Sequence, residues 1–204
     1  MKIFGIDPGS ERTGYGCVES DGRRHRLIVC GAISAPPHST FPERLANIHA
    51  ALAALLAEHR PDCVAIENVF HAKNVRSALK LGHARGVALL AASQAGLPVI
   101  EYAPAEIKRA VVGFGRAEKH QVGTMIKLLL ALDAVPSPHD AADALAVAIC
   151  HVNNSHGAIA RAIGLVSAPP GVRRAANARR AGAVAGVPAR PGRRSITSWR
   201  DYRP

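Results

Sequence analysis

Four acidic residues of this chain stand where their carboxylates could act together. Asp7 closes the apolar run KIFGID, and Glu67 stands near the end of a second apolar run, CVAIEN. Asp140 and Asp143 lie three residues apart in HDAADALAVAIC, which puts them on one face of a helix. Carboxylate oxygens are the ligands that Mg²⁺ prefers, and two such ions about 4 Å apart hydrolyse phosphodiesters. The four acids therefore indicate a two-metal hydrolase, provided that the fold brings them together.

Three of these acids also have a structural explanation when each is taken alone. Asp7 precedes a Pro-Gly pair and could open a turn. Glu67 could be an exposed residue at a strand end, and Asp140 could cap a helix whose dipole favours negative charge. Asp143 lies one turn inside an apolar helix and has no such explanation. The conjunction of the four is what favours a metal site.

The hydrophobic pattern predicts an α/β domain with a mixed five-stranded sheet flanked by helices. Three strands in quick succession favour an antiparallel meander, and the alternating helices and strands that follow favour parallel first, fourth and fifth strands. The expected strands span 2–7, 13–20, 26–35, 63–68 and 98–104, and the expected helices span 43–60, 74–96, 105–112, 118–132 and 139–153. If the first and fourth strands are neighbours, their carboxyl ends bring Asp7 and Glu67 to one edge, which the last helix can reach.

The net charge of +11 is concentrated at the C-terminal end. From Ala168 onward there are nine arginines and one acid, Asp201, in a stretch rich in Ala, Pro and Gly. Such a composition cannot bury enough apolar surface to offset the entropy of ordering. We expect a nuclease domain over 1–155 and a basic tail over 156–204, disordered from about residue 168. The tail would add sequence-blind, salt-sensitive affinity for polyanions.

The remaining composition favours a cytoplasmic protein with no membrane association. The four cysteines have neither metal-ligand spacing nor a disulfide pattern, so we expect reduced thiols. No apolar run reaches the 18 or more residues of a membrane helix, and the first ten residues do not form a signal peptide.

Five sequence blocks together resemble the RuvC family of Holliday-junction resolvases, in that family's order and spacing. The blocks are IFGIDPGSERTGYG, AIENVFHAKN, SALKLGHARGVA, EYAPAEIKRAVVGFGRAEKHQV and HDAADALAVAI, and they cover roughly residues 1–155. The resemblance implies a ribonuclease H-like fold and a homodimer. It also implies an Mg²⁺-dependent, structure-specific endodeoxyribonuclease that places paired, ligatable nicks across four-way DNA junctions in recombination and repair. The implied cofactor is Mg²⁺, with two ions per site that Mn²⁺ can replace. The implied protein partner is a branch-migration helicase complex of the RuvA and RuvB type.

The same resemblance assigns roles to individual residues. Asp7, Glu67, Asp140 and Asp143 match the catalytic, metal-binding acids. Some family members place a histidine at the third of these positions; His139 is adjacent to it here and is not a matched ligand. The expected DNA contacts are Phe70, Lys73, Arg76, Lys108, Arg116 and Lys119. Phe70 would stack on an unpaired base, Lys119 would approach a phosphate near the metals, and Arg109 and Lys127 are expected to be surface charges.

Other interpretations remain open at the level of sequence. A ribonuclease H-like nuclease could act on RNA or on another DNA branch, because the fold's carboxylates do not choose the substrate. A non-catalytic junction-binding module with a basic tail would leave the four acids unexplained. GIDPGS and TGYG also resemble the phosphate loop of actin-like ATPases, but about 155 ordered residues leave no room for their second domain. The helix 74–96 carries small residues on several faces, which suits burial against a partner subunit or within one domain.

Overall fold

The structure is a computed structural model that describes residues 1–68 and 74–162, with side chains described as far as Ser155. Phe70 and Lys73 lie outside the described residues, and so does most of the expected tail. No helix within the described part of the chain is both long and apolar enough to span a bilayer.

The five strands form one mixed sheet in the order β3-β2-β1-β4-β5. The first three are antiparallel neighbours, and β1 pairs in parallel with β4, as β4 does with β5, so the predicted topology is confirmed. The strands are β1 (Lys2–Asp7), β2 (Arg12–Ser20), β3 (His25–Ser34), β4 (Cys63–Glu67) and β5 (Val99–Tyr102). The last strand ends two residues before the predicted end, because Ala103 caps the next helix and Pro104 occupies its first turn.

In the described part of the chain, five helices connect and cover the strands. They are α1 (Phe41–His59), α2 (Val75–Gln94), α3 (Pro104–Val112), α4 (Lys119–Leu129) and α5 (His139–Ala162). The α4 helix ends three residues before the prediction, where Ala131 takes a left-handed φ of 50°. The α5 helix continues nine residues beyond the predicted end. At the predicted end, Asn153 and Asn154 donate side-chain hydrogen bonds to α3, at Ala110 and Glu106.

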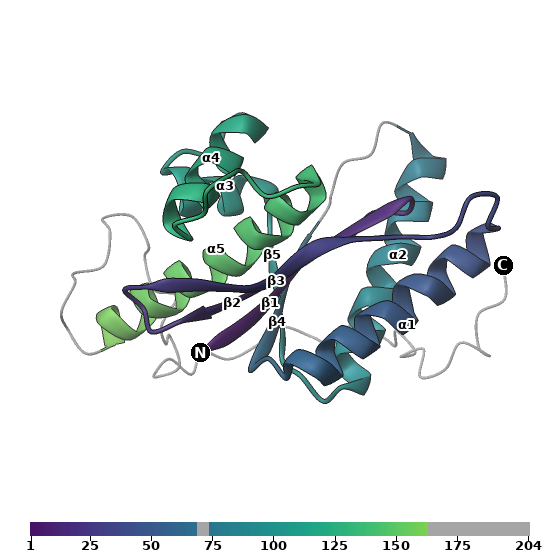
Figure 1. Ribbon diagram of the computed structural model, residues 1–204, viewed down its shortest axis with the longest axis horizontal. Coiled ribbons are helices and arrows are strands. Elements are labelled where there is room, and N and C mark those ends of the chain that lie inside the picture. The colour runs from purple at the N-terminus through teal and green to yellow at the C-terminus, as the bar shows by residue number, and fades with distance from the viewer. Residues whose placement is uncertain (69–73, 163–204) are drawn as a thin grey trace, which may run out of the picture. The chain divides into compact units, whose positions relative to one another are not determined.

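The sheet separates two cores, with α3, α4 and α5 on one face and α1 and α2 on the other (Figure 1). Successive side chains along a strand point to opposite faces of the sheet, which determines the core to which each residue belongs. In β1, Ile3 belongs to the α5 core and Phe4 to the α1–α2 core; in β4, Ala65 and Val64 divide in the same way. Continued to the strand ends, this alternation turns residues 7 and 67 toward the face that α5 covers.

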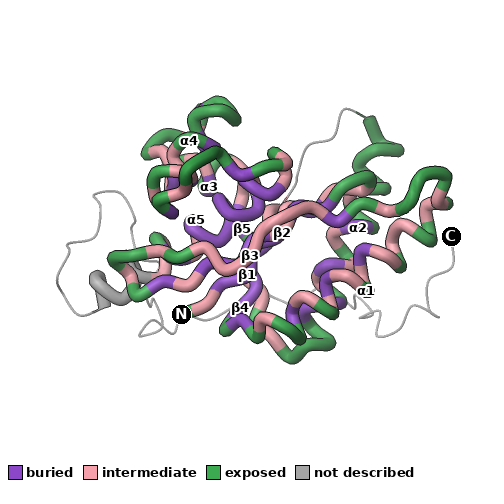
Figure 2. The backbone as a smooth tube through the Cα atoms, in the orientation of Figure 1, coloured by how far each residue is buried: buried purple, intermediate pink, exposed green. Residues whose placement is uncertain are grey.

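Glycines let α5 lie directly on the sheet. A Cβ at Gly5 would stand 2.1 Å from the carbonyl oxygen of Ala144, and one at Gly14 would stand 2.0 Å from that of Asp140. At Gly16 a Cβ would meet the Leu145 side chain at 2.6 Å. We call Gly5, Gly14 and Gly16 the glycine seat. Figure 2 shows that much of α5 is buried.

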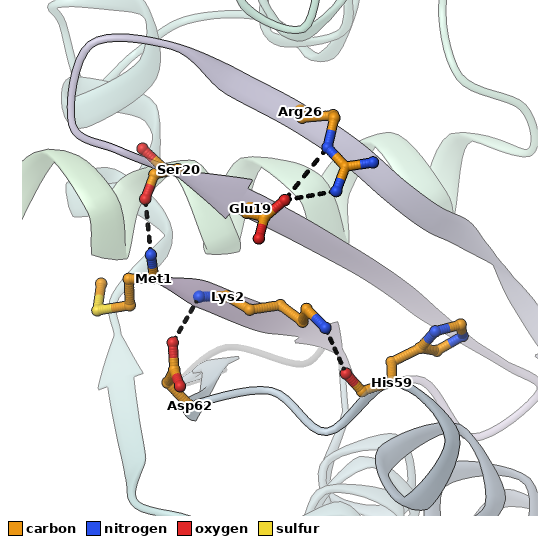
Figure 3. A network of polar contacts seen from close by, with 7 residues as sticks. All are labelled: Met1, Lys2, Glu19, Ser20, Arg26, His59 and Asp62. Carbon is orange, nitrogen blue, oxygen red and sulfur yellow. Dashed lines mark hydrogen bonds and ion pairs between the residues drawn. The ribbon is translucent and has the colours of Figure 1, made fainter.

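The other end of β1 is fixed by a polar network, drawn in Figure 3. The Met1 amino group donates to the Ser20 carbonyl at 2.7 Å. The Lys2 backbone N–H donates to Asp62 Oδ2 at 2.7 Å, while its Nζ donates to the His59 carbonyl at 2.8 Å. These bonds join the start of β1 to β2, to the last residue of α1 and to the connection that precedes β4, which fixes the strand whose far end carries Asp7.

Candidate active site

Asp7 and Glu67 meet at the carboxyl ends of β1 and β4. Ile6 is paired with Ile66 in the parallel ladder, so the residues that follow them are neighbours. Burial, the charge of Glu67 and a hydrogen bond with its side chain, and the charge of Asp143 raise the pKa of Asp7 to about 9, while Lys119 opposes the shift. Burial and the neighbouring carboxylates therefore favour the protonated form of Asp7 when no cation is bound.

Asp143 joins this pair from α5. Asp7, Glu67 and Asp143 line one hollow of about 440 Å³, together with Lys108 and Lys119. Lys119 Nζ donates to Asp143 Oδ2 at 2.7 Å, and this bond is the main cause of a raised Lys119 pKa. Three of the four predicted acids and two of the predicted basic residues thus share a single hollow.

Asp140 faces a different hollow. It lines a neighbouring space of about 610 Å³, together with Ser34 and the turn Gly9–Arg12. Arg12 Nη1 stands 3.3 Å from Asp140 Oδ2. Within residues 1–68 and 74–162, no three or more His, Cys, Asp or Glu side chains are already arranged to hold a metal ion. Both acids of α5 are instead paired with a basic side chain, so the four-acid ligand set remains a prediction.

The donor chemistry of the first hollow nevertheless fits a hard divalent cation. Its acidic lining consists of three carboxylates, and hard oxygen donors of this kind are what Mg²⁺ prefers. Burial and the neighbouring carboxylates raise the pKa of Asp7, and the positive charge of Lys119 opposes this shift only in part. His139 is exposed at the start of α5 and offers no visible contribution to the hollow.

The other predicted contact residues are distributed around this hollow or on the surface. Lys108 is half-buried in its lining, whereas Arg76 and Arg116 are exposed, on the first turn of α2 and in the turn before α4. Arg109 is exposed, in agreement with a surface role, and Lys127 is half-buried.

Two residues of the site were missed from the sequence. Arg12 pairs with Asp140 across 128 positions of chain, and Thr13 is fully buried behind it. The Thr13 hydroxyl donates to the Gly9 carbonyl at 2.9 Å and closes the turn that carries Arg12. The available signal was a basic residue and a hydroxyl directly after the DPGS turn, but only the fold reveals their partner.

This sheet order, with acids at the ends of β1 and β4 and on the helix that crosses them, is that of a ribonuclease H-like nuclease. The family described as crossover junction endodeoxyribonuclease RuvC matches residues 3–151. The chain belongs to this family.

Relatives and solved structures agree with that assignment. A crossover junction endodeoxyribonuclease RuvC from Pelotomaculum thermopropionicum is 52% identical over 154 residues, covering 76% of this chain and 94% of the relative. Another from Halorhodospira halophila is 53% identical over 173 residues, covering 85% and 99%. The Thermus thermophilus RuvC structure superposes with a TM-score of 0.72 at 36% identity, covering 78% of this chain and 97% of that chain. The T. thermophilus RuvC in complex with a Holliday junction substrate gives 0.71 at 34% identity, covering 77% and 96%. The chain is therefore a crossover junction endodeoxyribonuclease.

Proposed function

We propose that this chain resolves four-way DNA junctions by two-metal hydrolysis at Asp7, Glu67, Asp140 and Asp143. The observation that carries the proposal is the convergence of Asp7, Glu67 and Asp143 in one hollow with two lysines. A relative of the same fold has been solved with a Holliday junction as substrate, which supports this choice of DNA. Recombination and repair in the cytoplasm are the setting in which such junctions would be met.

The carboxylates would hold two Mg²⁺ ions, which Mn²⁺ could replace. When bound, the two ions supply a nucleophilic water and stabilise the leaving oxygen. The water oxygen would bond to phosphorus and lose a proton, while the bond to the 3′ oxygen would break and that oxygen would gain a proton. The products would be a 5′-phosphate and a 3′-hydroxyl, which a ligase can join. Lys119, with a side chain 76% exposed at the hollow, is free to exchange Asp143 for the phosphate, and Lys108 adds positive charge from within the lining.

A homodimer would place two such sites on opposite strands of a junction. One stripe of α2 exposes Val75, Leu79 and Leu90, with Gly82 and Gly86 between them. A Cβ on either glycine would meet nothing within 4 Å among the described residues, so a second helix could approach closely there. An isologous contact of this stripe with its copy has two-fold symmetry, like the junction itself, and paired incision follows from that symmetry.

The remaining DNA and protein contacts are proposed on the family resemblance. Phe70 would stack on an unpaired base at the crossover, and Lys73, Arg76 and Arg116 would neutralise phosphates around it. A branch-migration complex of the RuvA and RuvB type would deliver the junction.

Cleavage of a mobile synthetic four-way junction in Mg²⁺ tests the proposal. Asp7→Asn should lower the cleavage rate by about 10³-fold or more, because bound metal supplies several kcal/mol of transition-state stabilisation. Asp133→Asn is the matched control, since Asp133 is exposed in the loop before α5, and it should cleave like the parent.

The same assay tests separately which substrate the chain cleaves and whether it hydrolyses DNA at all. Symmetrical, ligatable nicks on the junction alone, lost in Asp7→Asn with junction binding retained, are the expected result. Cleavage of an RNA hybrid or a flap in place of the junction would overturn the choice of substrate and keep the site. Junction binding without cleavage in either Mg²⁺ or Mn²⁺ would overturn the hydrolytic function of this chain.

A further inference from the structure

The two acids of α5 are held in different surroundings although they lie on one helix face. Asp143 lines the hollow that contains Asp7 and Glu67, whereas Asp140 lines the neighbouring hollow beside Arg12. Gly14 contacts the backbone carbonyl of Asp140, so the main chain of α5 already lies as close to the sheet as it can at this point. The side chain of Asp140 is therefore what must move if it is to join the other three carboxylates.

The backbone of Arg12 is held in place, whereas its side chain can leave Asp140 and bind another group. It is the first residue of β2, directly before the buried Thr13 that closes the turn from Gly9. Its side chain is 53% exposed and that of Asp140 is 31% exposed. The pair is joined by one 3.3 Å contact, and exposed pairs of this kind contribute little stability. A group that binds Arg12 or Asp140 more tightly would therefore break this ion pair.

A DNA phosphate is such a partner for Arg12. The guanidinium group binds phosphate through two parallel hydrogen bonds, and the hollow beside it is open and borders the site. Glu11 and Asp140 also line that hollow, so with Asp140 in place its two acids outnumber its one arginine and repel a phosphate. Departure of Asp140 toward the metal site removes one of those charges.

We propose that Arg12 is a positioning residue that keeps Asp140 out of the metal site until a DNA phosphate takes the arginine. The inference rests on the proposed two-metal function and adds to it a coupling between DNA binding and completion of the ligand set. Such coupling is reciprocal. A phosphate bound at Arg12 raises the affinity for metal, and bound metal raises the affinity for that phosphate. A nuclease built in this way assembles its full site on DNA.

Metal binding without DNA is the first test. Mn²⁺ affinity of the full chain is measured by titration calorimetry for the parent, Arg12→Gln and the control Arg26→Gln, whose arginine is exposed and pairs with Glu19 on the same sheet. Arg12→Gln should bind Mn²⁺ about two- to five-fold more tightly, the effect of losing one exposed ion pair. Arg26→Gln should match the parent. Equal affinities for Arg12→Gln and the parent would overturn the inference.

An Asp140→Asn background separates gating from a general loss of positive charge. If Arg12 acts by holding Asp140, Arg12→Gln should change Mn²⁺ affinity in the parent and leave it unchanged in Asp140→Asn. The same gain in both backgrounds would mean that Arg12 acts only as a distant charge, which contradicts the proposal.

Junction binding supplies a readout that is independent of metal affinity. Binding is followed across a range of salt concentrations in Ca²⁺, with samples checked for the absence of nicked product. Loss of one phosphate contact should lower the slope of log K against log salt by about 0.9 in Arg12→Gln and leave it unchanged in Arg26→Gln. An unchanged slope in Arg12→Gln would remove the phosphate from the proposal.

Asp7→Asn distinguishes failure of this inference from failure of the proposed function. If Asp7→Asn binds Mn²⁺ as the parent does, the proposed metal site is wrong and the gating role falls with it. If Asp7→Asn loses Mn²⁺ while Arg12→Gln behaves like the parent, the metal site stands and only the role of Arg12 is wrong.

Discussion

At the scale of single residues, the site is a set of negative charges that its own basic side chains partly neutralise. Lys119 pairs with Asp143 and Arg12 with Asp140, while Asp7 is half-buried beside Glu67. The four acids could be predicted from the sequence because each lies at the end of a predicted strand or in the first turns of a predicted helix. The partner of Arg12 could not, because their contact exists only after strand and helix have packed.

The raised Asp7 pKa predicts how stability depends on pH without metal. From about pH 4 to 9 the unfolded chain releases this proton and the folded chain keeps it, so rising pH destabilises the fold. Asp7→Asn removes the effect. Its thermal midpoint should match the parent near pH 4 and exceed it at pH 8 by at least about 2–4 °C, the equivalent of roughly 1 kcal/mol.

Differential scanning calorimetry in EDTA measures this difference, and Asp133→Asn supplies the control. A constant difference between Asp7→Asn and the parent from pH 4 to 8 would contradict the assigned pKa direction. Added Mg²⁺ should raise the midpoint of the parent more than that of Asp7→Asn, because the ion binds the deprotonated carboxylate.

At the scale of elements, hydrophobic periodicity determined which segments are helices and which are strands, and tertiary contacts determined where some of them end. The α5 helix extends beyond its predicted end because the side chains of Asn153 and Asn154 donate hydrogen bonds to α3. The sequence predicted that the last helix reaches the sheet, but not that glycines of β1 and β2 make room for it, because a glycine within a strand does not indicate what packs on it. Only the packed structure shows that Gly5 and Gly14 face carbonyl oxygens of α5 and that Gly16 faces the Leu145 side chain.

Substitution in the glycine seat should be costly. Gly5→Ala would place a Cβ 2.1 Å from the Ala144 carbonyl oxygen, and the resulting shift of α5 should destabilise the fold by about 1–3 kcal/mol or more. Urea unfolding measures the change as a lower midpoint with an unchanged slope. Gly82→Ala, measured at concentrations where the chain is monomeric, is the control: its Cβ meets open space and should stabilise α2 by roughly 0.5–1 kcal/mol. Equal effects at both positions would refute the close contact.

At the scale of the whole molecule, the proposed activity needs two copies of the chain and a long anionic substrate. Composition could indicate a polyanion as partner, and the pattern of elements could indicate the fold. Neither could select a four-way junction, because ribonuclease H-like carboxylates serve many substrates. That step depended on long stretches of sequence shared with one family.

A charge on the exposed stripe of α2 should dissociate the dimer. Leu79→Glu would put an unpaired carboxylate into the proposed contact, at a cost of several kcal/mol, and should weaken dimerisation by about 10²-fold or more. Sedimentation equilibrium measures the dissociation constant. Leu128→Glu is the matched control, since Leu128 is equally exposed but lies on α4. A parent chain that remains monomeric, or a Leu79→Glu variant that dimerises as well as Leu128→Glu, would rule out this interface.

Removal of residues 168–204 should weaken DNA binding without changing its preference for structure. The deleted stretch carries nine arginines and one aspartate, so the affinity for junction and duplex should fall together and the salt dependence should become shallower by several phosphate equivalents. Fluorescence anisotropy across a salt series measures both. Loss of affinity for the junction alone would instead mean that the tail recognises the crossover.

The glycine seat also limits how this enzyme can change during evolution. Core positions usually vary in pairs, because a larger side chain on one element is matched by a smaller one on its neighbour. Where Gly5 and Gly14 meet carbonyl oxygens, the neighbour is main chain, which is the same for every amino acid, so no second substitution offers relief. In a saturation library selected for junction cleavage, these positions should accept no replacement and yield no suppressors elsewhere, whereas the paired apolar positions around them should drift.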